Sequence, residues 1–287
     1  MFSRTKTVRE SFQHFQLLIG STYEADEARS ISQIVFKEIL GYDTIKLILN
    51  ENELLPAPLF EQLDQVAYLL NQHKPIQYIL GFEEFMGIKL YVNENVLIPR
   101  PETEELVQWI VEDYKQQKNL TIADIGTGSG CIAISLKKII PQAFVHAIDV
   151  SKSALDIASK NALHTQQEIH FHQLNILNDD LPTKFDVLVS NPPYVLESEK
   201  MQMRKNVLDF EPSLALFVPD DDPLLFYKRI AMLAEQQLND AGTLYFEINE
   251  SYAAETQKLF SENAWHTPEL RNDIRGKARM LKATKRS

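Results

Sequence analysis

The chain of 287 residues has one cysteine, no long apolar run and fewer basic than acidic residues. Cys131 has no partner for an internal disulfide, and it follows a glycine cluster where a small residue is needed to start a helix. We interpret it as structural, with a reactive thiol as the alternative. No stretch approaches the roughly 20 apolar residues that cross a bilayer, and the N-terminal MFSRTKTVRESFQHF lacks a signal-peptide core. We expect a cytoplasmic protein that contacts no membrane.

The shortage of positive charge limits the partners of this chain. It has 29 Lys and Arg against 40 Asp and Glu, a formal net charge of -11. Such a surface repels phosphate backbones, although a local basic patch is compatible with it. Hydrophobic residues make up 44% and charged residues 24%, which is ordinary for a folded protein and argues against extended disorder. We expect no direct nucleic-acid substrate, and a monomer is the default expectation.

The length suits two structural units, since a domain typically has about 150 residues. Residues 10–72 show helical periodicity without strand alternation, which predicts a small helical domain over residues 1–75. Residues 78–98 then form two short extended runs, YILGFEEF and IKLYVNENVLI, joined around Gly87. This change of pattern predicts a β-hairpin connector over residues 76–98.

Strand-like and helix-like segments alternate beyond Pro99. The strand-like segments are TIADI, VHAID, IHFHQL, FDVLVS and TLYFEI, and helices are expected from Cys131 and from Ser153. The alternation predicts parallel strands joined by right-handed helical crossovers, and therefore a doubly wound, Rossmann-like α/β sheet over residues 99–287. Ligands of such sheets bind at the carboxyl ends of the strands, so the residues that follow each strand are the candidate site.

A glycine-rich loop, Gly126–Gly130, follows the strand TIADI and opens the next helix. Its glycines can turn tightly and let a ligand touch the backbone, and a tight turn without a ligand is the alternative. The spacing G-x-G-x-G differs from the dinucleotide fingerprint G-x-G-x-x-G, and Asp124 stands two places before the first glycine. This combination favours S-adenosylmethionine over NAD as the ligand.

Two further strand ends carry candidate cofactor ligands. Asp149 ends VHAID, where its carboxylate can accept hydrogen bonds from both ribose hydroxyls of a cofactor. The alternative for Asp149 is a cap for the helix that starts near Ser151. At the end of the third strand, Asn175 is placed to meet the adenine edge while Ile176 packs on the adenine face. A solvated asparagine beside a core isoleucine explains that pair equally well, so both interpretations stay open.

The fourth strand, FDVLVS, is followed by Asn191-Pro192-Pro193-Tyr194. The prolines stiffen the backbone and have no N–H to donate, so the segment offers carbonyl oxygens and the Asn191 side-chain acceptor. An amide or exocyclic amine nitrogen is a poor nucleophile because its lone pair is delocalised. Accepting hydrogen bonds from its N–H groups returns electron density to that nitrogen. Tyr194 can stack on the flat group near a sulfonium, and a proline-rich turn without chemistry is the alternative.

Taken together, these motifs resemble one known family. The combination of DIGTGSG, NPPY, PIQYILG from Pro75 and VLIPRPETE, with its core from Leu97 to Glu104, is similar to the HemK/PrmC family. Its members are the protein-(glutamine-N5) methyltransferases of peptide chain release factors, and FEPSLAL from Phe210 also fits them. NPPY alone is shared with amino-methyltransferases of adenine and guanine. A nucleic-acid amino-methyltransferase that flips a base into the pocket is therefore the alternative, against which the net charge of -11 argues.

The resemblance implies a class I methyltransferase fold, S-adenosylmethionine as methyl donor with S-adenosylhomocysteine as product, and a release factor as protein substrate. The helical domain, which carries no methyltransfer motif, is expected to recognise that protein. The cofactor-binding residues that the resemblance implies are Gly126, Thr127, Gly128, Ser129, Gly130 and Asp149. Asn175 and Ile176, from their place at a strand end, and Asn191, through its NH2, are the further cofactor-binding candidates. The implied catalytic residues are Asn191, Pro192 and Tyr194, and Pro193 joins them in substrate binding.

Two details of the implied cofactor pocket stay open. Family members often carry an aromatic residue at the position of Ile176, so adenine stacking is expected to be weaker here or to come from elsewhere. Arg100 and Glu102 are candidates for the methionine end of the pocket, and an exposed ion pair is the alternative. No metal is expected.

Overall fold

The computed structural model describes residues 6–287, which divide into two compact units. The helical unit contains the chain up to Gly81 together with Arg204–Phe210, and the α/β unit contains Phe82–Met203 and Glu211–Ser287. Each unit has hydrophobic clusters of its own. Every residue that lines the cavity described below belongs to the α/β unit.

The helical unit is built from amphipathic helices around one core. Its helices are α1 (Val8–Ile19), α2 (Ala25–Leu40), α3 (Thr44–Leu49), α4 (Ala57–Asn71), α5 (Ile76–Leu80) and, from later in the chain, α9 (Lys205–Leu208). The start of α1 is fixed by a capping box, because the Thr7 hydroxyl accepts from the Glu10 N–H and the Glu10 carboxylate accepts from the Thr7 N–H. Phe15, Phe36 and Leu70 are fully buried, which makes apolar packing the main source of stability here.

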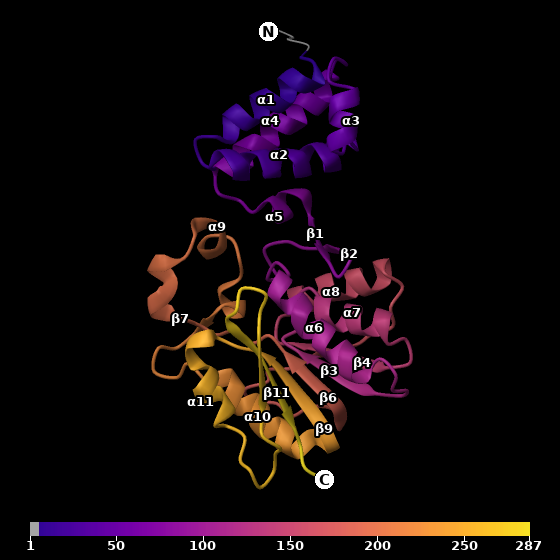
Figure 1. The fold of residues 1–287 in the computed structure, drawn as a ribbon, viewed down its shortest axis with the longest axis vertical. Helices are drawn as coiled ribbons and strands as arrows, with labels where there is room; N and C mark the ends of the chain where they lie inside the picture. Colours follow the sequence, from indigo (N-terminus) through magenta and orange to yellow (C-terminus); the bar gives the residue numbers. More distant parts are fainter. Residues whose placement is uncertain (1–5) are drawn as a thin grey trace. The chain divides into compact units, whose positions relative to one another are not determined.

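A seven-stranded sheet forms the centre of the α/β unit (Figure 1). In spatial order its strands are β10 (Glu269–Asn272), β11 (Ala278–Thr284), β9 (Leu238–Glu247), β6 (Phe185–Ser190), β3 (Thr121–Ile125), β4 (Phe144–Asp149) and β5 (His170–Gln173). The strands from β9 to β5 are parallel, and β11 runs antiparallel to both β9 and β10. The predicted doubly wound α/β fold is confirmed.

Helices cover both faces of this sheet. They are α6 (Pro101–Tyr114), α7 (Cys131–Ile139), α8 (Lys152–His164), α10 (Leu225–Gln237) and α11 (Ala253–Gln257). Trp109 of α6 packs on one face with residues of α7, and Tyr227 of α10 packs on the other with Phe246 of β9. In Figure 1, α6, α7 and α8 gather beside β3 and β4, whereas α10 and α11 lie beside β9 and β11.

Short elements complete the α/β unit. They are β1 (Phe82–Phe85), β2 (Ile88–Tyr91), β7 (Val195–Leu196), η1 (Glu197–Gln202), η2 (Ser213–Ala215), β8 (Phe217–Val218) and η3 (Glu250–Tyr252). The predicted hairpin exists as β1 and β2, with Gly87 in the left-handed region at its turn. The expected extended conformation from Tyr78 is wrong, because residues 76–80 form α5. A helical turn that follows Pro75 and ends at left-handed Gly81 is favoured there, and the apolar run could not distinguish it from a strand.

The strand register brings three strand ends to one level. Ile125 of β3 pairs with Ile148 of β4 and with Ser190 of β6. Because these strands are parallel, the glycine loop after β3, Asp149 at the end of β4 and Asn191 after β6 all lie at the same edge of the sheet.

Three histidines gather on β4 and β5. His146 stacks on His172 with an interplanar angle of 3°, and their facing ring nitrogens lie 2.9 Å apart. The ring centroid of His170 lies 4.9 Å from that of His146. Burial, reinforced by His172 and His170, lowers the pKa of His146 to about 4, and burial with His170 also lowers the pKa of His172.

We expect this cluster to make folding stability fall in mild acid. Histidines of the unfolded chain titrate near a pKa of about 6.5, so between about pH 6.5 and pH 4 the unfolded state binds more protons than the folded state. The stability supplied by the neutral rings is therefore present above pH 6.5 and is lost as the pH falls. Urea unfolding at about pH 7.5 and about pH 5 measures this loss. Between these pH values His146→Gln should lose less free energy of unfolding than wild type, and His266→Gln, at an exposed position, should lose as much as wild type. Equal losses in wild type and both variants would contradict the expectation.

Candidate active site

The glycine loop after β3 adopts a backbone that requires glycine. Gly126, Gly128 and Gly130 have φ angles of 74°, 54° and 81°, all in the left-handed region. A Cβ at Gly126 or Gly128 would meet nothing within 4 Å, whereas one at Gly130 would lie 3.1 Å from the Cβ of Ala158. Gly126 and Gly128 therefore expose backbone to open space, and Gly130 lets the loop pack closely against α8.

Asp124 anchors this loop through hydrogen bonds of its side chain. Its side chain is fully buried, and Oδ2 accepts from the Thr127 hydroxyl at 2.6 Å and from the Ala133 N–H at 3.2 Å. Within the described residues, its Oδ1 has no hydrogen-bond partner. Burial raises the pKa of Asp124 to about 7 against the opposing effect of these hydrogen bonds. The carboxyl thus ties the glycine loop to the first turn of α7.

Asp149 is held by backbone N–H groups that surround its carboxylate. Oδ2 accepts from the Gly128 N–H and Oδ1 from the Ser151 N–H, each at 2.9 Å. A carboxylate has about four acceptor positions, so capacity for a ligand remains beside the backbone N–H groups of Gly128, Ser151 and Val150. The N-cap of α8 is Ser151, whose hydroxyl accepts from the Ala154 N–H at 3.2 Å. Burial raises the pKa of Asp149, and the N–H bonds from Ser151 and Gly128 oppose that shift.

A cavity of about 240 Å³ opens at this edge of the sheet. The predicted site residues that line it are Gly126, Gly128, Asp149, Asn175, Ile176, Asn191, Pro192 and Pro193. The other predicted residues, Thr127, Ser129, Gly130 and Tyr194, lie outside its lining. Three of these four belong to the glycine loop, where Thr127 and Ser129 are buried. The strand-end motifs thus converge on one cavity, in which the glycines rather than the residues between them face the open space.

Part of the cavity lining is an apolar cluster. Ile176 lies there with Phe226 and Ile230 of α10, and the sequence analysis missed both α10 residues because no motif marks them. Asn175 lines the same region, and its Oδ1 accepts from the Leu177 N–H at 3.1 Å. This bond fixes the Asn175 oxygen toward the backbone, and the Asn175 NH2 is the group that can donate to a ligand.

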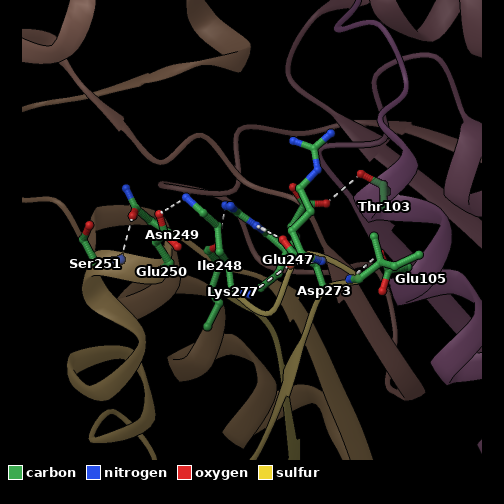
Figure 2. Close-up of polar contacts among 12 residues, drawn as sticks. Thr103, Glu105, Glu247, Ile248, Asn249, Glu250, Ser251, Asp273 and Lys277 are labelled. Carbon is green, nitrogen blue, oxygen red and sulfur yellow. Dashed lines mark hydrogen bonds and ion pairs between the residues drawn. The ribbon is translucent and has the colours of Figure 1, made fainter. Parts of the chain in front are cut away.

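The Asn191-Pro192-Pro193-Tyr194 segment rests on two residues that the sequence analysis also missed. Asn191 Nδ2 donates to Thr103 Oγ1 at 3.2 Å, and the Thr103 hydroxyl donates to Glu247 Oε2 at 2.6 Å. The Tyr194 hydroxyl donates to Glu247 Oε1 at 3.3 Å. Burial raises the pKa of Glu247. Burial also raises the pKa of Tyr194, and the negative charge of the neighbouring Glu247 adds to that shift. Figure 2 shows the Thr103 hydroxyl turned toward the Glu247 carboxylate.

Arg100 and Glu102 do not line the cavity, contrary to their candidate role. The Arg100 guanidinium instead lies 2.6 Å from the carboxylate of buried Glu211. The second oxygen of Glu211 accepts from the Ile98 N–H at 3.2 Å. Because Pro212 follows Glu211 and lines the cavity, this ion pair fixes one wall of the site.

Within residues 6–287, no helix is long and apolar enough to span a membrane. The same part of the chain holds no group of three or more His, Cys, Asp or Glu residues arranged to bind a metal ion.

Comparisons with known proteins identify related chains. Residues 103–209 match the Methyltransferase small domain, and residues 19–81 match the PrmC N-terminal domain. The release factor glutamine methyltransferase of Flavobacterium psychrophilum is 46% identical over 93% of this chain and 95% of its own length. The enzyme of that name from Bacteroides thetaiotaomicron is 42% identical over 98% of this chain and 99% of its own.

Solved structures support the fold. The hMettl16 catalytic domain, solved in complex with MAT2A 3'UTR hairpin 6, superposes with a TM-score of 0.55 at 16% identity, covering 82% of this chain and 84% of that chain. A methyltransferase from Pyrococcus furiosus gives a TM-score of 0.52 at 14% identity over 70% of this chain and 90% of that chain. The predicted class I methyltransferase fold is confirmed, as is the predicted family. The chain belongs to the family of the release factor glutamine methyltransferases.

Proposed function

We propose that this protein transfers a methyl group from S-adenosylmethionine to the side-chain amide nitrogen of a glutamine in a bacterial peptide chain release factor. The observation that carries the proposal is the meeting of two groups in one cavity. The Gly126 and Gly128 backbone with Asp149 forms a nucleoside-type cradle, and Asn191 with Pro192 offers acceptors beside it. The names of the relatives at 46% and 42% identity favour a glutamine over a nucleic-acid base as the acceptor.

The residues of the cavity fit this cofactor. A carboxylate that lines the cavity at the end of β4 can accept hydrogen bonds from ribose hydroxyls, and Asp149 provides it. The backbone at Gly126 and Gly128 leaves the space that a Cβ would fill, so a ligand can approach it closely. Ile176 and Phe226 offer apolar surface for a flat base, and the Asn175 NH2 offers a donor for a ring nitrogen.

In the mechanism, Asn191 and Pro192 orient the acceptor nitrogen. The bound cofactor supplies an electrophilic methyl group on a positively charged sulfur. The Asn191 side-chain oxygen and the Pro192 carbonyl accept from the two N–H groups of the glutamine amide, which aims the nitrogen and returns electron density to it. Holding the reacting atoms in line supplies most of the acceleration. The methylated amide is very acidic before it loses its proton, so solvent can take that proton and no strong base is needed.

Phe226 is expected to supply the adenine contact that an aromatic residue at position 176 would otherwise give. Phe226→Ala should weaken binding of S-adenosylhomocysteine about fivefold to tenfold, because an aromatic contact contributes about 1 kcal/mol beyond its buried area. Calorimetric titration measures the dissociation constant. Met232→Ala, on the exposed side of the same helix, is the control that should bind as wild type does. An unchanged constant for Phe226→Ala with a wild-type melting temperature would remove Phe226 from the adenine site.

We further propose that the helical unit recognises the release factor, because none of the unit's residues that the structure describes lines the cavity. Adding release factor should then slow amide hydrogen exchange in α1 to α4, since bound surfaces open less often. S-adenosylhomocysteine alone should slow exchange in the glycine loop and leave those helices unchanged. A saturated complex without any protection between residues 6 and 81 would argue against this role.

The proposed activity is tested with methyl-labelled S-adenosylmethionine and two candidate acceptors. The purified protein should transfer label to an unmodified release factor and none to RNA or DNA. Transfer to nucleic acid alone would establish the base-flipping alternative instead. A release factor as substrate implies the cytoplasm as the place of reaction, and one chain holds a whole cavity, so we expect a monomer to be active.

A further inference from the structure

Thr103 and Glu247 lie behind Asn191, outside the cavity lining. Thr103 stands in the first turn of α6, and Glu247 is the last residue of β9. The two residues are only 3% and 2% exposed, so a ligand that fills the cavity does not contact them. Any influence they have on the reaction must therefore pass through the residues that they hold.

The direction of the hydrogen bonds fixes the orientation of the Asn191 amide. The Thr103 hydroxyl has one proton, and it donates that proton to Glu247 Oε2 at 2.6 Å. Thr103 Oγ1 is then left as an acceptor, and the Asn191 NH2 donates to it at 3.2 Å. The Asn191 NH2 is thereby turned to Thr103, and its carbonyl oxygen is left for another donor. A flipped amide would present N–H groups to the N–H groups of a substrate amide, donor against donor.

The same carboxylate also holds the other end of the motif. Glu247 Oε1 accepts from the Tyr194 hydroxyl, so the two oxygens of one side chain serve Asn191, through Thr103, and Tyr194 directly. The backbone beneath Glu247 is fixed as well. Glu247 pairs with Met280 of β11, and its carbonyl accepts from the Tyr227 hydroxyl at 3.2 Å. A rigid strand end therefore anchors both side chains of the segment.

We propose that Thr103 and Glu247 are positioning residues, which hold the Asn191 amide with its oxygen toward the acceptor nitrogen of the substrate. This inference rests on the proposed function, in which Asn191 accepts a hydrogen bond from a glutamine N–H. It adds that the acceptor is oriented by a relay from β9 through α6, made of residues that touch neither substrate nor cofactor.

The first test compares two substitutions of Thr103 that differ by the hydroxyl. Thr103→Val keeps the shape but cannot accept from Asn191, and it should lower kcat on release factor about tenfold or more at saturating cofactor. Thr103→Ser keeps the hydroxyl and should retain most of the rate. The dissociation constant for S-adenosylhomocysteine should stay within about twofold of wild type in both variants, since neither touches the cofactor cradle. Thr103→Ala removes the same hydroxyl and replaces Thr103→Val if that variant does not fold.

The decisive measurement is a double-mutant cycle with Asn191→Ala in single turnovers. If Thr103 acts through Asn191, then adding Thr103→Val to Asn191→Ala should cost no further rate. If Thr103 had a purely structural role, Thr103→Val would lower the single-turnover rate by the same factor in wild type and in Asn191→Ala, and that result would overturn the proposal. A wild-type rate for Thr103→Val alone would overturn it as well. Failure of the wild-type protein to methylate release factor would overturn the proposed function and this inference with it. If the wild-type protein methylates release factor but the effects of Thr103→Val and Asn191→Ala on the free energy of activation add, only the positioning role would be overturned.

Discussion

Replacing Asn191 by alanine is expected to lower the rate constant of methyl transfer on the order of a hundredfold or more, while cofactor affinity falls much less. The contact with the substrate N–H strengthens as electron density shifts toward the methyl group, so its loss appears in the transition state. Single-turnover methylation of a glutamine-containing release factor, with cofactor saturating, measures that step.

Asn191→Asp is the matched variant for this prediction. It keeps an acceptor and adds a charge that attracts the sulfonium, but it cannot donate to Thr103. It should retain more activity than Asn191→Ala if accepting a hydrogen bond is the essential role. A near-wild-type rate for Asn191→Ala would rule out orientation of the amide by this residue.

Replacing Asp149 by alanine is expected to weaken the binding of S-adenosylmethionine by roughly 2–3 kcal/mol, which is the scale of charge-assisted hydrogen bonds. The variant loses the acceptors for the ribose and also the bond that holds the Gly128 N–H. Calorimetric titration decides the outcome, with the melting temperature as a check on the fold. An unchanged dissociation constant in a folded variant would remove Asp149 from the site.

The pH dependence of cofactor affinity gives a second view of Asp149. Burial raises the pKa of this carboxyl above the usual range of an aspartate, so it takes up a proton at a higher pH than an exposed aspartate does. Affinity for the cofactor should fall as the pH drops through that raised pKa, because the protonated carboxyl is a weaker hydrogen-bond acceptor. Asp149→Ala should lack this component of the pH profile.

The elements that the sequence predicted best are those whose signal is local. The segments TIADI and FDVLVS coincide with β3 and β6, because both are buried apolar runs that end at a turn. The segment after Pro75 was misjudged as extended, since five residues cannot establish a helical period. The loop Gly126–Gly130 was recognisable because its glycines are close together in sequence and their left-handed backbone follows from that residue type.

The residues that escaped prediction act across long separations in sequence. Asn191 meets Thr103 over 88 residues, and Thr103 meets Glu247 over 144. Glu247 ends a parallel strand, which marks the correct edge of the sheet, but no spacing rule names its partners. For Arg100 the sequence left a pocket role and an exposed ion pair both open, whereas in the folded chain Arg100 binds buried Glu211 on a distant segment.

The chemical position of the transferred methyl group tests the central claim most directly. Release factor methylated with labelled cofactor is hydrolysed in strong acid, which breaks an N-methylated amide into a carboxylic acid and methylamine. Methylation of a glutamine amide predicts that the label is recovered as methylamine and that fragmentation of the intact protein places the added methyl group on a glutamine side chain. Label released as methanol by mild base, or retained on a nucleic-acid base, would contradict it.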